Sequence, residues 1–289
     1  MPLRELHRQV AAIALRAAAR YGFALGGGNA LIAHGVINRL TQDVDLVTNR
    51  ETGVKAATGP VEIALRREGF TAQRKDRTSE LADIFPDLGD ELADWAITAP
   101  GNQHTDLQLA YFDRSREPVL MDVGPVLDLE DVAGSKVCAL AGRAERRDYV
   151  DTAALLERWT AAELIGFARR LDPGLDGRDL ADAATRLDRM PDHLFTPLGL
   201  TRQDIATLRE RFAVWPRDAR VASRAQGGRE FSDNSAPRDG REEPTYTREG
   251  TGDLQPEANR GLGPAAGTRG RRRPAARERV RDDELEIGR

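Results

Sequence analysis

The stretch of chain that decides the fold is FALGGGNALIAHGVINRLTQDVDLV, residues 23–47. It begins with a short apolar run, passes through Gly26-Gly27-Gly28, and ends in an alternation of aspartate and aliphatic residues from Asp43 onward. The apolar run and the alternation each predict a strand. Asn29 is a residue type that caps helices, so we expect a helix over residues 30–34. The stretch therefore predicts a strand, a glycine turn, a helix and a second strand.

The second strand carries two aspartates that point to the same face, Asp43 and Asp45. Their carboxylates are suited to hold divalent cations, and Mg²⁺ is the cation that prefers such oxygen ligands. Glycines directly after a strand let the backbone approach a triphosphate, whose oxygens the N–H groups of the next helix can bind. A glycine cluster alone is more often a simple turn, and D-x-D alone is common in surface strands. In this order and spacing, they predict metal-assisted nucleotidyl transfer.

A third carboxylate on a neighbouring strand would complete such a metal site. Residues 105–112 alternate in the manner of a strand that pairs with residues 95–98. Asp106 on this strand is the candidate third metal ligand, and the alternative is an exposed position at the start of the strand. If the ligand position is instead that of Gln108, the third carboxylate is missing.

A second block, residues 127–151, has helical spacing. Lys136 lies among apolar residues, which places its ammonium near the core side of a helix, where a phosphate would stabilise the charge. Arg143, seven residues later, returns to the same side. Asp148 and Asp151, three residues apart, share a face. The alternatives are that Lys136 extends its ammonium into water, and that Arg143 and the two aspartates form a structural ion-pair network.

Together the two blocks resemble the motifs of the AbiEii family of nucleotidyltransferase toxins, which includes the mycobacterial MenT toxins. The resemblance covers roughly residues 20–160, and it implies a DNA-polymerase-β-like nucleotidyltransferase core followed by a helical lobe. The positions that carry it are Gly27, Gly28, Asn29, His34, Arg39, Thr41, Asp43, Asp45, Lys136, Arg143, Arg147, Asp148 and Asp151.

The resemblance also implies roles for these residues. Asp43 and Asp45 would bind metal, Lys136 would contact the nucleotide phosphates, and Asp148 or Asp151 would be a downstream catalytic acid. Asn29 stands where the family usually has Ser or Thr, whose hydroxyl contacts a phosphate, and its amide can donate in the same place. The nucleotide-binding residues would be Gly27, Gly28, Asn29, Arg39, Thr41, Lys136 and Arg143.

The function implied by the resemblance is that of a toxin in a type IV toxin–antitoxin pair. Such a toxin would use Mg²⁺ to transfer a nucleotide from an NTP to the 3′ end of tRNA, and a winged-helix antitoxin would be encoded beside it. Two other functions are compatible with the sequence. One is nucleotidyl transfer to a small molecule or a protein, which needs no basic groove. The other is a catalytically inert nucleotide-binding module, favoured if Asp106 and Lys136 lie far from the aspartate pair.

Composition defines the organisation of the 289-residue chain. We predict an α/β core over residues 1–125, a helical lobe over 126–216, and a disordered tail over 217–289 that is rich in Arg, Gly and Pro and poor in apolar residues. The net charge of −4 gives no general signal for nucleic-acid binding. The single cysteine, Cys138, excludes an intramolecular disulfide. Without a signal-peptide pattern or an apolar run of about 18 residues, the sequence predicts a cytoplasmic protein with no membrane association.

Overall fold

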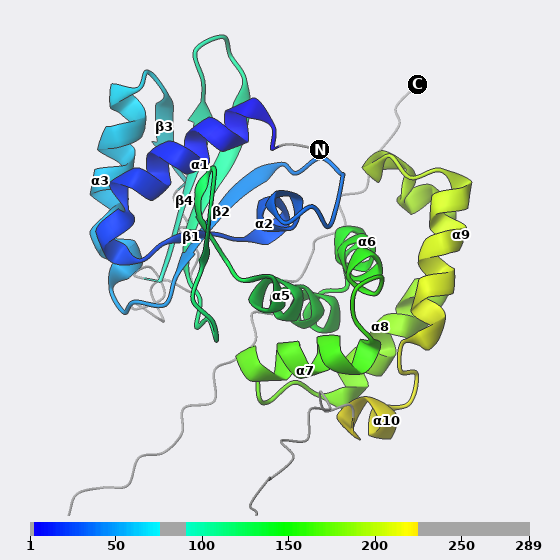
Figure 1. Ribbon diagram of the computed structural model, residues 1–289. Helices are drawn as coiled ribbons and strands as arrows, with labels where there is room; N and C mark the ends of the chain where they lie inside the picture. Colours follow the sequence, from blue (N-terminus) through cyan, green and yellow to red (C-terminus); the bar gives the residue numbers. More distant parts are fainter. Residues whose placement is uncertain (1–2, 76–90, 225–289) are drawn as a thin grey trace, which may run out of the picture. The chain divides into compact units, whose positions relative to one another are not determined.

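A mixed seven-stranded sheet lies at the centre of the part of the chain that the structure describes, residues 3–75 and 91–224 (Figure 1). The structure is a computed structural model, and these residues fall within one compact unit, residues 1–228. In spatial order the strands are β3 (Thr71–Arg74), β4 (Leu92–Thr98), β5 (His104–Tyr111), β2 (Asp43–Thr48), β1 (Ala24–Leu25), β7 (Gly124–Val126) and β6 (Val119–Met121).

Strand β2 lies in the middle of this sheet, parallel to β5 and antiparallel to β1. Side chains along β2 point alternately to its two faces. Val44 and Leu46 are fully buried in the core, so Asp43 and Asp45 face the opposite side. The register places Asp43 opposite Asp106 on β5. The strand pattern of the sequence therefore fixes which face of the sheet carries the acidic pair.

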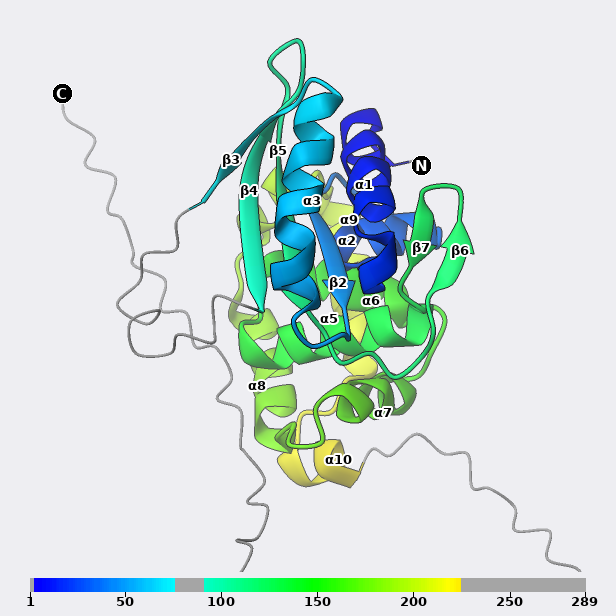
Figure 2. The same ribbon diagram turned by 90° about the vertical axis from the view of Figure 1, so that its left-hand side faces the viewer.

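Helices cover both faces of the sheet. Helices α1 (Glu5–Ala17) and α3 (Gly53–Arg67) pack beside each other over one face, as Figure 2 shows, and α3 begins against Thr48. Helix α2 (Gly27–Ala33) begins against Asp45 and contacts α5 (Leu129–Gly142). Since Thr48 and Asp45 are three positions apart on one strand, they point to opposite faces. The acidic pair therefore faces α2 and α5.

After β7, the described chain is helical. Helix α5 contacts α6, α7 and α8, and a second core forms where the rings of Tyr149 and Trp215 each lie 5.6 Å from the ring of Phe212. The Trp215 indole N–H donates to the carbonyl of Leu180 at 2.9 Å, which satisfies its one donor. The helices are α6 (Arg146–Leu155), α7 (Ala161–Leu171), α8 (Gly177–Arg189), α9 (Arg202–Arg211) and α10 (Ala219–Arg224), with short 3₁₀ turns between them that include η4 (Thr196–Leu198).

The predicted α/β class is confirmed. The strand predicted from Asp43 onward is present as β2. Alternation also predicts a strand over residues 71–74, and helical spacing predicts a helix over residues 161–171; β3 and α7 occupy those residues. The predicted pairing of the strands around residues 95–98 and 105–112 is also present, as the antiparallel pair β4–β5. The spacing of apolar residues was sufficient to predict these elements, because each of them has one face against the core.

Four local expectations were wrong or incomplete. Asn29 does not cap a helix, because α2 begins two residues earlier at Gly27. Helical spacing predicts a helix over residues 61–68, but α3 begins earlier, at Gly53, and passes through Pro60. The β6–β7 hairpin and α9 were not predicted. Helix α10 lies inside the range predicted to be disordered from residue 217, and its Ala222 is fully buried against the helical core.

The remainder of that range, from residue 225 on, lies outside the described residues, as do residues 76–90. The proposed division into a core over residues 1–125 and a helical lobe over 126–216 stays a prediction. Within the described part of the chain, no helix has the length and apolar character that crossing a membrane requires.

Candidate active site

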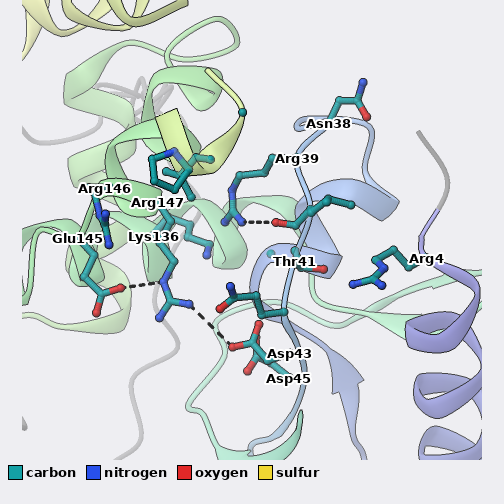
Figure 3. A pocket seen from close by; sticks show the side chains of 16 residues that line it. Arg4, Asn38, Arg39, Thr41, Asp43, Asp45, Lys136, Glu145, Arg146 and Arg147 are labelled. Atoms are coloured by element: carbon teal, nitrogen blue, oxygen red, sulfur yellow. Dashed lines mark hydrogen bonds and ion pairs between the residues drawn. The ribbon is translucent and has the colours of Figure 1, made fainter. Parts of the chain in front are cut away.

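The two aspartates of β2 lie at the floor of a cavity of about 740 Å³ (Figure 3). Its walls come from Arg4 near the N-terminus, from residues between 28 and 45, from the α5–α6 region, and from the turn at residues 197–199. Charged side chains dominate the lining. The basic residues are Arg4, Arg39, Lys136, Arg146 and Arg147, and the acidic residues are Asp43, Asp45 and Glu145. The structure thus brings Lys136 from the second sequence block into the same cavity as the aspartate pair.

The carboxylates of Asp43 and Asp45 differ in their environments. Burial raises the pKa of Asp45 to about 6, and the negative charge of Asp43 adds to the shift; Lys136 and Arg147 act in the opposite direction. Asp43 is more open, and its Oδ2 lies 3.9 Å from the Arg147 guanidinium. Arg147 in turn pairs with Glu145 at 2.9 Å, as the dashed lines in Figure 3 show. The floor therefore carries two like charges that cations stabilise only incompletely.

Gly27 is required by the position of Asp45. Its φ of +59° lies in the left-handed region, and a Cβ built there would fall 1.8 Å from Oδ2 of Asp45. The preceding Gly26 donates its N–H to the Asp45 carbonyl at 2.8 Å, which holds the turn against β2. Gly28 also approaches closely, because a Cβ there would meet the Thr41 methyl at 2.7 Å. The glycine run therefore lets α2 begin directly beside the acidic pair.

We expect Gly27→Ala to lose nucleotide transfer by at least about 100-fold, because the new methyl must displace the Asp45 carboxylate. Gly35→Ala is the matched control: Gly35 has a similar φ of +67°, yet a methyl added there would meet nothing within 4 Å. Both variants should lose roughly 1–2 kcal/mol of unfolding free energy from the left-handed conformation, and Gly27→Ala should lose roughly 1–3 kcal/mol more from the overlap with Asp45. Urea denaturation and transfer rates measure the two effects. Equal activity of the two variants would contradict the close approach of Gly27 to Asp45.

Asn29 faces the protein interior, and it does not line the described cavity. Its amide N–H donates to the Asp43 carbonyl at 2.7 Å, and its amide oxygen accepts from Thr41 Oγ1 at 2.7 Å. His7 of α1 completes this network, with Nδ1 3.1 Å from Thr41 Oγ1. Burial lowers the pKa of His7, which favours the neutral ring. The network fixes the backbone that enters β2.

His7 was not recognised from the sequence. The signal was present, because His7 shares a helix face with Ala11 and Ala14, and all three are buried. A histidine on an apolar helix face predicts a buried partner, but the pattern does not say which one. Its partners, Asn29 and Thr41, are 22 and 34 residues away in the chain.

Asp151 is the centre of a buried ion-pair cluster. Its carboxylate accepts two hydrogen bonds of 2.7 Å from the Arg39 guanidinium and lies 2.9 Å from the Lys136 ammonium. The side chain of Asp151 is fully buried, and those of Arg39 and Lys136 are 11% and 9% exposed. Burial opposes ionisation, yet Lys136 and Arg39 together hold the pKa of Asp151 below its ordinary value. Asp151 therefore connects α6, α5 and the segment before β2.

Asp148 has a different set of contacts. Its buried carboxylate binds the Arg143 guanidinium through two hydrogen bonds, of 2.9 and 3.0 Å, and accepts from the Glu145 N–H at the start of α6. Neither Asp148 nor Asp151 is among the residues that line the cavity, and neither is Arg143. The contacts of Arg143, Asp148 and Asp151 are thus those of buried ion pairs, which was the structural alternative to a catalytic role.

Asp106 lies beside Asp43 in the sheet, as the third-ligand hypothesis requires. Its carboxylate, however, is 53% exposed and pairs with Lys75 at 2.6 Å. Gln108, opposite Asp45, donates to Asp94 at 2.9 Å. Across residues 3–75 and 91–224, no set of three or more His, Cys, Asp or Glu side chains is arranged to hold a metal ion. The aspartate pair of β2 is thus not joined there by a third carboxylate.

Two solved structures have folds similar to that of this chain. JHP933 from Helicobacter pylori is 17% identical with a TM-score of 0.48, over 76% of this chain and 93% of that one. The nucleotidyltransferase toxin MenT4 from Mycobacterium tuberculosis is 15% identical with a TM-score of 0.50, over 77% of this chain and 88% of that one. No curated protein matches the sequence.

The MenT4 comparison concerns the fold alone, and family membership rests on the sequence. The model of the nucleotidyl transferase AbiEii toxin family of type IV toxin–antitoxin systems matches residues 10–225, which include both motif blocks and every residue of the cavity except Arg4. The chain therefore belongs to the AbiEii family of nucleotidyl transferase toxins.

Proposed function

We propose that this protein transfers a nucleotide from an NTP to RNA, at the 3′ end of tRNA, in a reaction that depends on Mg²⁺. The observation that carries the proposal is the single cavity that holds Asp43 and Asp45 together with the cationic side chains of Arg39, Lys136 and Arg147. This combination suits a triphosphate, because the cations bind phosphate oxygens and the carboxylates bind metal.

The carboxylates that face the cavity fit a hard divalent cation. Asp43 and Asp45 present oxygen ligands on one strand face. Burial, together with the charge of Asp43, raises the pKa of Asp45, and a cation bound beside the pair would offset both effects. Mg²⁺ held by this pair would supply charge neutralisation at the reacting phosphate. Asp106 remains the candidate for a third ligand, provided that it releases Lys75.

The protein side chains have distinct tasks in the proposed reaction. The 3′-hydroxyl oxygen of the acceptor bonds to the α-phosphorus, and its proton leaves to water. The bond from the α-phosphorus to the oxygen that bridges to the β-phosphate breaks, and pyrophosphate leaves. Lys136 and Arg39 hold the phosphates in position, and Arg147 lies next to Asp43, where charge develops. Gly27 and Gly28 give the chain the close approach to Asp45 and Thr41 that shapes the floor.

Asp151 and Asp148 act in this proposal as positioning residues. Asp151 fixes the directions of Arg39 and Lys136, both of which reach the cavity, while its own carboxylate has no free face toward the reacting atoms. Asp148 fixes Arg143 and the first turn of α6. Through these contacts the two aspartates support phosphate binding indirectly.

RNA is the proposed acceptor because the cavity has five basic lining residues and three acidic ones. A small-molecule acceptor needs no such excess of positive charge, whereas an RNA backbone does. Family membership implies an antitoxin partner, which we propose to be a winged-helix protein. Because we propose tRNA as the acceptor, we also propose that the protein acts in the cytoplasm.

The proposal is tested by incubating the protein with total tRNA, Mg²⁺ and each labelled NTP in turn. We expect at least one nucleotide to be incorporated into tRNA, and incorporation to stop when EDTA removes the metal. A parallel reaction without RNA detects self-labelling or transfer to a small molecule. Failure to label RNA with any of the four nucleotides, in a sample shown to be folded by circular dichroism, would overturn the proposal.

A further inference from the structure

Two short segments of the cavity wall differ chemically from the rest. One contributes Leu40 and the other contributes Pro197 and Leu198, whereas charged groups, amides, a hydroxyl and glycines make up the remaining lining. Leu40 is 64% exposed, although large aliphatic side chains on this chain are mostly buried. A single exposed leucine is common on protein surfaces. Leu40, Pro197 and Leu198, however, give an otherwise polar and charged cavity apolar surface, which suits an apolar ligand group.

Leu40 lies on a segment that is held rigidly on either side of it. Its neighbour Arg39 is bonded to the buried Asp151 and also donates to the Leu40 carbonyl at 3.1 Å. Its other neighbour, Thr41, is bonded to the buried Asn29. The leucine side chain thus stays exposed although the backbone on both sides is fixed, which preorganises it for contact with a ligand.

Pro197 and Leu198 reach the same cavity from a distant segment, the η4 turn. The fully buried ring of Phe195 anchors this turn, and its carbonyl accepts from the Leu198 N–H at 3.0 Å. The proline ring restricts the backbone further. Two fixed backbone segments, about 157 residues apart in the chain, therefore each place aliphatic side chains in a single cavity.

We propose that Leu40, Pro197 and Leu198 form the subsite for the nucleobase of the incoming nucleoside triphosphate, an inference that rests on the proposed nucleotidyltransferase function. A nucleoside triphosphate has an anionic end and a flat base with an apolar face. The cavity has matching parts, since cations and the aspartate pair lie in the same space as the aliphatic group. Its volume of about 740 Å³ falls in the range of sites for one small ligand.

The composition of the subsite also predicts how it treats different bases. Aliphatic side chains contact the face of a base, and every base has such a face, so this contact contributes affinity without strong choice among bases. Asn38 and Gln42 also line the cavity, and their amides offer both donors and acceptors to a base edge. Truncating the aliphatic residues should therefore weaken the binding of all NTPs that the protein accepts.

The test is equilibrium binding, which needs no acceptor and so is independent of transfer to RNA. Isothermal titration calorimetry with Mg²⁺ present gives Kd for ATP, GTP, CTP, UTP and inorganic tripolyphosphate, which has no base. The variants are Leu40→Ala and Leu198→Ala. The matched control is Leu120→Ala, because Leu120 is 80% exposed on β6 and does not line the cavity.

We expect Leu40→Ala and Leu198→Ala each to raise the Kd of the bound NTPs by about tenfold. The Kd of tripolyphosphate should stay within twofold of the native value, and Leu120→Ala should change neither. Equal weakening of NTP and tripolyphosphate, unchanged NTP binding, or a native protein that binds no NTP would each overturn the inference. So would an unchanged Kd for NTP with a raised KM for RNA, because the subsite would then hold the terminal base of the acceptor.

Discussion

Asp45→Asn is expected to abolish nucleotide transfer and, at the same time, to make the metal-free protein more stable at pH 8. The loss of transfer should be at least about 100-fold, because the variant removes one of the two carboxylates that face the cavity floor. The gain in stability follows from the environment of Asp45, whose charge is unfavourable in the folded state. A residue kept at a cost in stability is typical of a functional site.

The sign of the stability effect follows from the direction of the pKa shift. Burial and the charge of Asp43 raise the pKa of Asp45 from 3.8 to about 6 in the folded protein. Below pH 3.8 the carboxyl is neutral in both the folded and the unfolded state and carries no penalty. As the pH rises through 6, the folded state must bear the charge, and stability is lost. Asparagine is neutral at every pH, so the variant avoids a loss of up to about 3 kcal/mol at pH 8 and roughly half of that at pH 5.

Urea denaturation in EDTA at pH 5 and pH 8 measures this difference. Asp122→Asn serves as the control, because Asp122 is an exposed turn residue and its replacement should change stability by less than about 0.5 kcal/mol. Addition of Mg²⁺ should stabilise the native protein at pH 8 and have little effect on Asp45→Asn. If Asp45→Asn were less stable than the native protein at pH 8, Asp45 would have to be a structural hydrogen-bond acceptor.

Asp151→Asn should produce the largest loss of stability of any single substitution in the described cavity region. It leaves the guanidinium of Arg39 and the ammonium of Lys136 facing each other, although both side chains are nearly buried. Removing one partner of a buried ion cluster costs on the order of 3–5 kcal/mol. For a chain of this size, that corresponds to a fall of roughly 10 °C in Tm.

Asp188→Asn is the matched control for this variant. Asp188 also pairs with an arginine, Arg217, but the two side chains are 52% and 47% exposed, so the loss should stay below about 1 kcal/mol. The kinetics separate the two roles proposed for Asp151. Loss of a positioning residue should raise KM for the NTP, because Arg39 and Lys136 move, whereas loss of a catalytic acid would lower kcat in a protein of normal stability. A lower kcat at normal stability would support the role of catalytic acid that the motif resemblance implied for Asp151.

Local sequence patterns were sufficient for strands β1 to β5 and for the reaction class. The alternation through Asp43 and Asp45 predicted a strand with both carboxylates on one face, because side-chain direction in a strand follows from a period of two. The glycine run predicted that the backbone approaches a triphosphate, and that remains a prediction. The close approach present in the structure is that of Gly27 to the Asp45 carboxylate, which the local pattern did not predict.

The roles of the polar residues around the pair could not be read in the same way. Asn29 occupies the position of a phosphate contact in the motif, yet its amide bonds Asp43 and Thr41 within the protein. Asp151 lies in the motif as a candidate acid, yet its carboxylate is satisfied by Arg39, 112 positions earlier in the chain. The spacing of residues within a motif does not indicate a hydrogen-bond partner that lies so far away in the chain.

The sequence by itself determined strands β1 to β5, the face that carries the aspartates and the family, because these depend on residue type and short-range periodicity. Only the tertiary structure decided which charges reach the cavity. Lys136 and Arg39 both reach it, while Asp148 and Asp151 do not line it. The physical reason is that a buried charge must find a partner wherever the fold brings one within about 3 Å. That pairing, made between distant segments, leaves Asp43 and Asp45 on the cavity floor, where only Arg147 forms an ion pair with Asp43 in the described part of the chain.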